Sequence, residues 1–275
     1  MKFLFFSLAA LFCFTACNNN MKPKATEMEA KKRPVIIAEP VTYTGDSITM
    51  NGFVAYDSAL QGKLPVVMII HEWWGLNDYT KSRAKQLADL GYLAMAVDLY
   101  GNGINGNNPE EATKLATPFY TNPLTAQKRF DAALEKIKTF PQADTSKIAA
   151  IGYCFGGSMV LNLAALGENL KAVVSFHGGL RTVPAEKNTL KAKILVCHGA
   201  ADKFISPEEI AKFRQNLDSI GAQYTFKAYD SALHAFTNPE ATEMGKKFNI
   251  AVAYNAAADS ASWKDMKAFF EQYLH

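Results

Sequence analysis

The sequence lacks the features that mark several special classes of protein. It has no internal repeat, only four cysteines in 275 residues, and no apolar run as long as a membrane-spanning helix requires. About half of the residues are apolar (49%), so a chain of this length can bury a sizeable core. These counts leave a globular protein of one large domain or two small ones.

The chain also has no large excess of positive or negative charge outside its N-terminal segment. The net charge is +3, but residues 21–34 hold five Lys/Arg and two Glu, and Lys2 adds one more positive charge. The rest of the chain is therefore close to −1, with no basic patch that would bind nucleic acid. We do not expect nucleic acid among its partners.

The N-terminus has the layout of a bacterial export signal. A positive start at Lys2 precedes the short apolar run Phe3–Phe14, and small residues precede Cys17. The arrangement resembles a lipobox, so we expect a signal peptide at residues 1–16 and a lipidated cysteine with a flexible tether at residues 17–34. We expect the protein to be exported and held on a bacterial membrane by the lipid, either on the periplasmic side or at the cell surface. An ordinary secretory signal is the alternative, because the third residue before the cysteine is not the usual Leu.

From residue 35 onward, short apolar runs alternate with longer helical patterns. Several runs are continuous and rich in Val and Ile, which is typical of parallel strands covered on both faces. The alternation predicts one doubly wound α/β domain at residues 35–275, with a mostly parallel sheet between helices. The predicted strands are Ser47–Tyr56, Leu64–Ile70, Leu93–Asp98, Lys147–Gly152, Ala172–Phe176, Lys193–His198 and Gln223–Tyr229. The predicted helices are Thr80–Leu90, Thr125–Phe140, Gly157–Leu166, Pro207–Ile220 and Asp259–Leu274. The least regular internal stretch, Gly101–Pro123, is expected to be either a pocket rim or a solvated surface loop.

The most informative motif joins a predicted strand to a predicted helix. The run Lys147–Ile151 leads directly into Gly152-Tyr153-Cys154-Phe155-Gly156-Gly157. This is the layout of a nucleophile elbow, the sharp turn on which α/β-hydrolases hold their attacking side chain. The glycines are needed because strand and helix pack closely there. Cys154 is therefore the candidate nucleophile, and the expected fold is the α/β-hydrolase fold.

An elbow of this kind requires an acid and then a histidine later in the chain. Asp202 follows the predicted strand Ile194–Cys197, and His234 follows the predicted strand Thr225–Tyr229. A histidine can accept the thiol proton, and a carboxylate on its other nitrogen fixes its tautomer. The internal histidines that precede this acid are expected to be wall or packing residues: His71, His177 and His198. Cys197 is expected to lie in the core, with its thiol and that of Cys154 both free.

Four motifs in this order resemble the dienelactone hydrolase family. They are His71-Glu72-Trp73-Trp74-Gly75-Leu76-Asn77, the elbow, Asp202 and His234-Ala235-Phe236. The resemblance covers about residue 41 to the C-terminus. It implies that Cys154, Asp202 and His234 form a catalytic triad.

The resemblance also implies roles for residues around the nucleophile. Glu72 matches a glutamate that contacts the cysteine in the resting enzyme and takes its proton when substrate arrives. The backbone N–H groups of Phe155 and Trp73 would form an oxyanion hole. The surroundings of Glu72 fit, because an apolar strand precedes it and two tryptophans follow, and burial raises the proton affinity of a carboxylate. A surface ion pair is the alternative for Glu72.

Arginines that hold the substrate carboxylate in well-known family members are absent here. The two stretches of this chain that correspond to the arginine positions are Tyr100-Gly101-Asn102-Gly103 and His234-Ala235-Phe236-Thr237-Asn238-Pro239. Asparagine cannot replace the two-pronged grip of a guanidinium group, so a dienelactone is not the default substrate. Trp74, Tyr100 and Phe236 are the candidate substrate contacts.

Together these features predict hydrolysis of a small-molecule carboxylic ester or lactone, through a covalent thioester on Cys154. The chemistry requires no metal and no cofactor. A cysteine peptidase or acyltransferase on the same fold is the first alternative, although no dedicated peptide-binding domain is visible. A non-catalytic, substrate-binding lipoprotein is the second, and the presence of nucleophile, acid and histidine argues against it.

Overall fold

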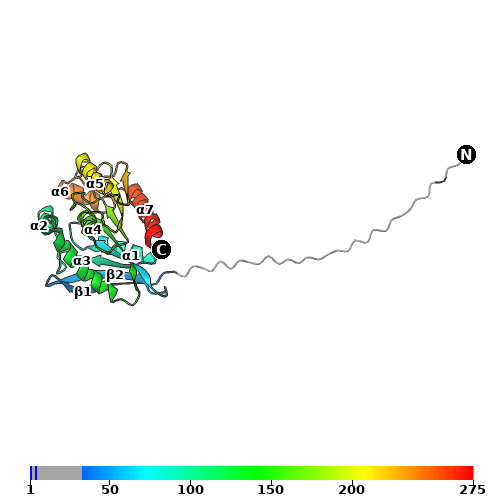
Figure 1. Cartoon of the computed structure of the whole chain (residues 1–275), viewed down its shortest axis with the longest axis horizontal. Coiled ribbons are helices and arrows are strands. Elements are labelled where there is room, and N and C mark those ends of the chain that lie inside the picture. The colour runs from blue at the N-terminus through cyan, green and yellow to red at the C-terminus, as the bar shows by residue number, and fades with distance from the viewer. Residues whose placement is uncertain (2–3, 5–32, 275) are drawn as a thin grey trace. The chain divides into compact units, whose positions relative to one another are not determined.

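The computed structural model describes residues 1, 4 and 33–274. The chain divides into two units, Met1–Arg33 and Pro34–His275, and the elements below all belong to the second unit. Figure 1 shows the whole chain. The predicted signal peptide, Cys17 and most of the predicted tether lie outside the described residues, so these three predictions stay predictions.

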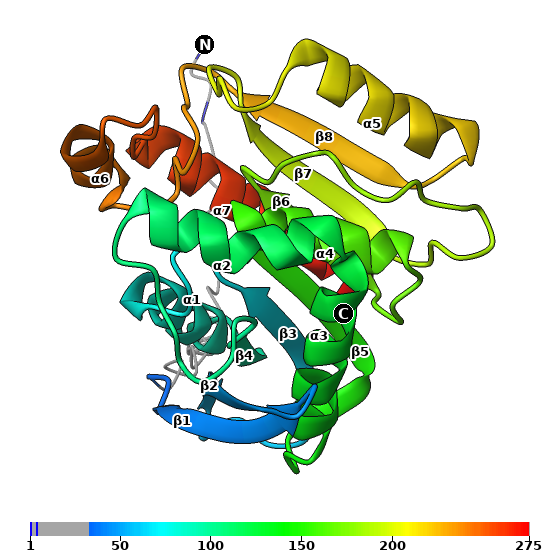
Figure 2. The same cartoon turned by 90° about the vertical axis from the view of Figure 1, so that its left-hand side faces the viewer.

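Eight strands of the second unit form one sheet in the order β1-β2-β4-β3-β5-β6-β7-β8 (Figure 2). Strand β2 runs antiparallel to its neighbours β1 and β4, and the remaining pairs are parallel. The strands are β1 (Ile36–Gly45), β2 (Ile48–Asp57), β3 (Leu64–Ile70), β4 (Leu93–Val97), β5 (Ala143–Tyr153), β6 (Ala172–Phe176), β7 (Lys193–Gly199) and β8 (Tyr224–Tyr229). The mostly parallel sheet predicted from the sequence is confirmed.

Helices cover both faces of this sheet, as Figure 2 shows. They are α1 (Asp78–Asp89), α2 (Pro109–Thr121), α3 (Pro123–Lys138), α4 (Phe155–Ala165), α5 (Pro207–Ser219), α6 (Ala241–Phe248) and α7 (Ala256–Leu274). Alternate residues of a parallel strand enter opposite cores. In β3, Met68 and Ile70 pack on the side of α3 and α4, whereas Val67 and Ile69 pack on the side of α1 and α7. Among the described residues, no helix is long and apolar enough to cross a membrane.

Local signals set the start of helix α5 close to where the sequence predicts it. The Ser206 side chain accepts the N–H of Glu209, and the Glu209 side chain accepts the N–H of Ser206. Pro207 occupies the first turn, where its missing N–H has no cost. This helix follows β7 and fixes the direction in which the loop carrying Asp202 leaves the sheet.

Three elements were not predicted from the sequence: β1, α2 and α6. The prediction that Gly101–Pro123 is irregular is wrong over α2, which begins with Asn108 accepting the N–H of Glu111. Its buried residues, Ala112, Ala116 and Phe119, recur at helical spacing. The Gly and Asn residues that precede the helix obscured this short apolar period.

The strand-to-helix turn between β5 and α4 is built on close backbone contact. Cys154 has φ 52° and ψ −112°, a conformation that is strained for a residue with a Cβ. A Cβ on Gly152 would collide with the backbone of Gly156, and a Cβ on Gly156 would collide with the carbonyl group of Ile70. The elbow predicted from the glycine pattern is therefore confirmed as a turn that only glycine at these positions allows.

We expect Gly152→Ala to lower the free energy of unfolding by about 3 kcal/mol, because the backbone it meets cannot move aside. Urea denaturation measures the change. Gly179→Ala is the matched control, since its nearest neighbour is the Ser158 hydroxyl, which can rotate away. Equal losses in the two variants would contradict this account of the elbow.

Candidate active site

Four residues singled out from the sequence meet at one edge of the sheet. Glu72 follows β3, Cys154 follows β5, Asp202 follows β7 and His234 follows β8. Parallel strands place their carboxyl ends at the same edge, which is the usual position of a ligand crevice in α/β folds. Glu72, Asp202 and His234 are buried, and Cys154 is half-buried.

A continuous chain of hydrogen bonds joins three of these residues. The Cys154 Sγ atom lies 3.0 Å from His234 Nε2, and His234 Nδ1 lies 2.7 Å from Asp202 Oδ2. The other oxygen of Asp202 accepts the backbone N–H of Phe204 at 2.8 Å, which holds the carboxylate in place. The structure thus brings together the three side chains that the chain order predicts to act as nucleophile, base and orienting acid.

Charge around the imidazole favours its protonated form. Burial by itself lowers the pKa of His234, but the charge of Cys154 and the hydrogen bond that the imidazole donates to Asp202 outweigh burial and raise it. Cys154 also caps the N-terminus of α4, where the helix dipole stabilises a negative charge. The start of α4 and the imidazole thus place two positive electrostatic features beside the sulfur.

Two backbone amides beside the sulfur have no hydrogen-bond partner among the described residues: those of Phe155 and Trp73. Phe155 is the first residue of α4, so its N–H has no carbonyl group one turn earlier. The N–H of Gly156 donates to the carbonyl of His71 at 3.0 Å and ties the loop containing Trp73 to the elbow. An oxyanion hole requires free N–H donors of this kind, and the family resemblance assigns that role to these two amides.

Glu72 is buried, and its carboxylate binds a residue that the sequence analysis did not single out. Asn238 Nδ2 donates to Glu72 Oε2 at 2.6 Å. Among the described residues, no hydrogen bond joins Glu72 to Cys154, so the contact implied by the family resemblance is absent in this conformation. Burial raises the pKa of Glu72 to about 7, although the hydrogen bond from Asn238 opposes the rise. The surface ion pair considered for Glu72 is excluded by its burial.

A cavity of about 240 Å³ opens beside Cys154 and His234. Most of its wall is apolar, with contributions from Trp73, Trp74, Phe204, Met244, Ile250 and Val252. Tyr120, from the unpredicted helix α2, also lines it. Trp73 and Trp74 are therefore walls of this cavity, as the sequence analysis expects.

Tyr100 and Phe236, the other two candidate substrate contacts, do not line this cavity. The Tyr100 hydroxyl donates to the carbonyl of Trp73 at 2.9 Å, and its ring packs on Phe155. Phe236 is fully buried against Tyr229 on the opposite face of the sheet. Each belongs to a stretch where the family carries a substrate-binding arginine, but position in the sequence does not tell on which side of the backbone a ring lies.

The remaining internal histidines occupy packing positions, as expected, but His177 also contacts the elbow. The Cys154 N–H is shared between the Phe176 carbonyl at 3.0 Å and His177 Nδ1 at 3.1 Å. Burial holds the pKa of His177 well below its usual value, so the ring is neutral. Its Nε2–H therefore donates to Thr237 Oγ1, 2.7 Å away.

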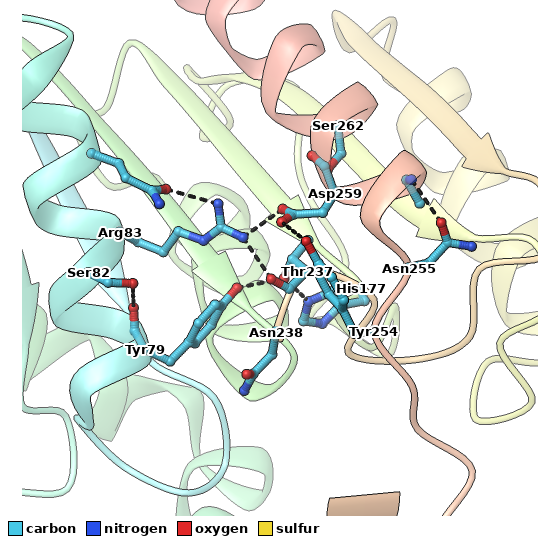
Figure 3. Close-up of polar contacts among 12 residues, drawn as sticks. Tyr79, Ser82, Arg83, His177, Thr237, Asn238, Tyr254, Asn255, Asp259 and Ser262 are labelled. Atoms are coloured by element: carbon cyan, nitrogen blue, oxygen red, sulfur yellow. Dashed lines mark hydrogen bonds and ion pairs between the residues drawn. The ribbon is translucent and has the colours of Figure 1, made fainter. Parts of the chain in front are cut away.

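Figure 3 shows the buried polar network that continues from Thr237. The Tyr79 hydroxyl lies 2.6 Å from Thr237 Oγ1, and Arg83 donates to the Thr237 carbonyl at 2.7 Å. Arg83 also forms a 2.6 Å ion pair with Asp259 of helix α7. The loop that carries His234 and Asn238 is thus anchored to two helices, α1 and α7. In the described part of the chain, no three His, Cys, Asp or Glu side chains are grouped as metal ligands would be.

We expect Glu72→Gln to change how stability depends on pH. The pKa of Glu72 is about 7 in the folded protein against an ordinary value of 4.5, so the folded protein binds this proton more tightly than the unfolded chain. Rising pH therefore destabilises the wild type between pH 4.5 and about 7. The variant has no such group, and its free energy of unfolding relative to wild type should rise over this range by up to about 3 kcal/mol.

Urea denaturation at several pH values between 4.5 and 8 measures this difference. Glu39→Gln, at an exposed position on β1, is the control for removal of a carboxylate that water solvates. A difference that does not change with pH for Glu72→Gln would contradict the raised pKa of Glu72.

Comparisons with known proteins identify the family of the chain. A family model described as "Dienelactone hydrolase family" matches residues 50–274. A curated relative from Aquifex aeolicus, "Putative carboxymethylenebutenolidase", is 25% identical over 243 residues, which is 86% of this chain and all of the relative. "Protein usf" of Aquifex pyrophilus is 27% identical over 76% of this chain and 89% of its own length.

Solved structures give the same result. The crystal structure of a dienelactone hydrolase-like promiscuous phosphotriesterase from metagenomic libraries has a TM-score of 0.81 and 32% identity, over 87% of this chain and 99% of that one. A dienelactone hydrolase from Anabaena variabilis shares the fold, with a TM-score of 0.62, 21% identity, and coverage of 89% of this chain and 100% of its own. The family match spans most of the sheet and every residue of the site, and the chain therefore belongs to the dienelactone hydrolase family of α/β-hydrolases and is a hydrolase.

Proposed function

We propose that this hydrolase cleaves small-molecule carboxylic esters or lactones through a covalent thioester on Cys154. The observation that carries the proposal is the hydrogen-bond chain from Cys154 Sγ through His234 to Asp202, at the wall of an apolar cavity. The nucleophile, its base and the group that orients the base are in direct contact, which is the arrangement nucleophilic catalysis requires.

In the first half-reaction, the sulfur of Cys154 attacks the ester carbonyl carbon while its proton resides on His234 Nε2. The negative charge that develops on the carbonyl oxygen is stabilised by the N–H groups of Phe155 and Trp73. Such a donor contributes about 2.7–4 kcal/mol in comparable enzymes. When the intermediate collapses, the C–O bond to the alcohol breaks, and His234 gives its proton to the leaving oxygen.

In the second half-reaction, water replaces the alcohol. His234 takes a proton from the water as its oxygen attacks the thioester carbon, and the same two amides bind the oxyanion. The C–S bond then breaks, the acid leaves, and the sulfur regains its pairing with His234. Asp202 keeps the imidazole in one orientation throughout both halves.

Glu72 supplies a second acid–base group beside the nucleophile. It lines the same cavity as Cys154, and its pKa of about 7 lets it hold or release a proton near neutral pH. A turn of the Cys154 side chain from His234 toward Glu72 would restrain the thiol between reactions, as the family resemblance implies. The hydrogen bond from Asn238 would then be the contact that keeps Glu72 in place.

We expect Asp202→Asn to lower kcat by about 10³–10⁴-fold, as the loss of the orienting acid does in serine enzymes, and Cys154→Ala to abolish acylation. Hydrolysis of 4-nitrophenyl esters measures the rate, and mass spectrometry of the protein during turnover measures the acyl adduct. Cys197→Ala is the control, because this second thiol is buried in β7 and should acquire no acyl group. Equal ester turnover in Cys154→Ala would rule out the thioester route.

Phosphotriester hydrolysis is a second candidate function. The observation in its favour is the 32% identity to a promiscuous phosphotriesterase across almost that entire chain. Turnover of diethyl 4-nitrophenyl phosphate, compared between wild type and Cys154→Ala, tests it.

We also propose that the N-terminal segment directs export, with lipid attachment at Cys17. The support is the order of a positive residue, an apolar run and small residues before this cysteine. Metabolic labelling with a fatty acid should mark the full chain in a bacterial host but not the Cys17→Ser variant. Labelling of both would place the lipid elsewhere.

A further inference from the structure

The ionisable side chains that line the active-site cavity do not include a lysine or an arginine in the described part of the chain. They are Glu72, Tyr120, Cys154 and His234. Arg83, which holds the loop after β8, is bonded to Asp259 and to the carbonyl of Thr237, and it does not line the cavity. A substrate carboxylate would therefore find no free cationic side chain there.

The positive charge that the imidazole favours is already paired. His234 is bonded to Asp202 on one side and to Cys154 on the other, so both of its nitrogens are engaged. Asn238, whose side-chain amide lines the cavity, is bonded to the Glu72 carboxylate. An anion placed in this cavity would lose its hydration and lie close to Glu72, which costs several kcal/mol.

A neighbouring hollow has no excess of positive charge either. It shares the wall residues Trp74 and Met244 with the cavity, and its charged members are Glu240, Glu243 and Lys247. The two carboxylates outnumber the one ammonium group. The electrostatic environment on both sides of the shared wall thus opposes anionic substrates.

The size and wall of the cavity indicate what does fit. An apolar cavity of about 150 Å³ accommodates benzene in another protein. The cavity here has a volume of about 240 Å³, enough for a phenyl ring with a short chain or for a branched alkyl group. During turnover the acyl group stays on Cys154 while the alcohol leaves, so the space around this sulfur belongs to the acyl group.

We propose that the enzyme acts on esters whose acyl group is uncharged, apolar and of about this size, and that it excludes acyl groups bearing a carboxylate. The inference rests on the proposed ester hydrolysis and specifies its substrate class. Exclusion follows from the absence of a counter-charge in the cavity, and acceptance follows from its aromatic and aliphatic wall.

A binding experiment tests the charge preference without turnover. In Cys154→Ala, the fluorescence of Trp73 and Trp74 reports occupation of the cavity by 4-phenylbutan-2-one or by 3-phenylpropanoate, which have the same shape and differ in charge. Trp74→Phe identifies the part of the signal that comes from the wall. The neutral ketone should bind about 10-fold more tightly or better. Equal affinity, or tighter binding of the carboxylate, would overturn the inference.

A kinetic experiment tests the same preference in the wild type. The acyl groups of 4-nitrophenyl 4-methylpentanoate and mono(4-nitrophenyl) succinate have nearly the same shape, and the second carries a carboxylate. After subtraction of the uncatalysed rates, kcat/KM should favour the neutral ester by about 100-fold or more. A ratio near one would overturn the inference.

A charge placed on the wall should reverse part of this preference. Met244, on α6, lines the cavity, so Met244→Arg should shift the kcat/KM ratio toward the succinate ester by about 10-fold, because it supplies the missing counter-charge. Met244→Gln removes the same thioether without adding charge, and kcat/KM should still favour the neutral ester. An equal shift in both variants would overturn the role of charge.

The two proposals fail in different ways. Selective binding of the ketone, without turnover of either ester and without acylation of Cys154, would overturn the thioester mechanism and support the charge preference. Acylation of Cys154 by both esters at equal rates would support the mechanism and overturn the preference.

Discussion

The structure of the site depends on the approach of α4 to the ends of β3 and β5. Glycine at 152 and 156 lets the helix backbone come close to both strands, and the resulting turn holds Cys154 at φ 52°. The same contact places the free N–H of Phe155 at the start of the helix and, through the bond from Gly156 to the His71 carbonyl, brings in the loop after β3. One steric constraint therefore positions the nucleophile and both candidate oxyanion donors.

The loop after β8 contributes the other half of the site and needs a different kind of support. It carries His234 and Asn238, which bind groups from three other strand ends. Arg83 donates a hydrogen bond to the Thr237 carbonyl of this loop, and its ion pair with Asp259 is buried. A buried polar network is costly to form but specifies one arrangement of its members when all are bonded. Rigidity at this loop matters because the imidazole must stay aligned with both the sulfur and Asp202.

Some residues near the cavity could be predicted from the sequence, and others could not. The elbow and the order of acid and histidine could be predicted because each depends on local pattern: glycines around one nucleophile, and polar residues directly after apolar strands. Tyr120 and Phe236 could not be assigned in this way. Tyr120 reaches the cavity from a helix that crosses toward the elbow, and Phe236 points into the opposite core although it is only two residues from His234. Which side a ring faces is decided by packing between elements distant in the chain.

By itself, the sequence determined the fold class and supplied a candidate nucleophile with candidate partners, because strand periodicity and the glycine pattern of the elbow are local features of the chain. Only the tertiary structure decided the charge and volume of the substrate cavity, since its wall combines residues from the loop after β3, from α2, from the loop after β7 and from the segment around α6. It also decided the partner of Glu72, because the Asn238 amide that bonds its carboxylate lies 166 residues further along the chain. Such contacts depend on how the ends of several strands and helices converge, which no local pattern encodes.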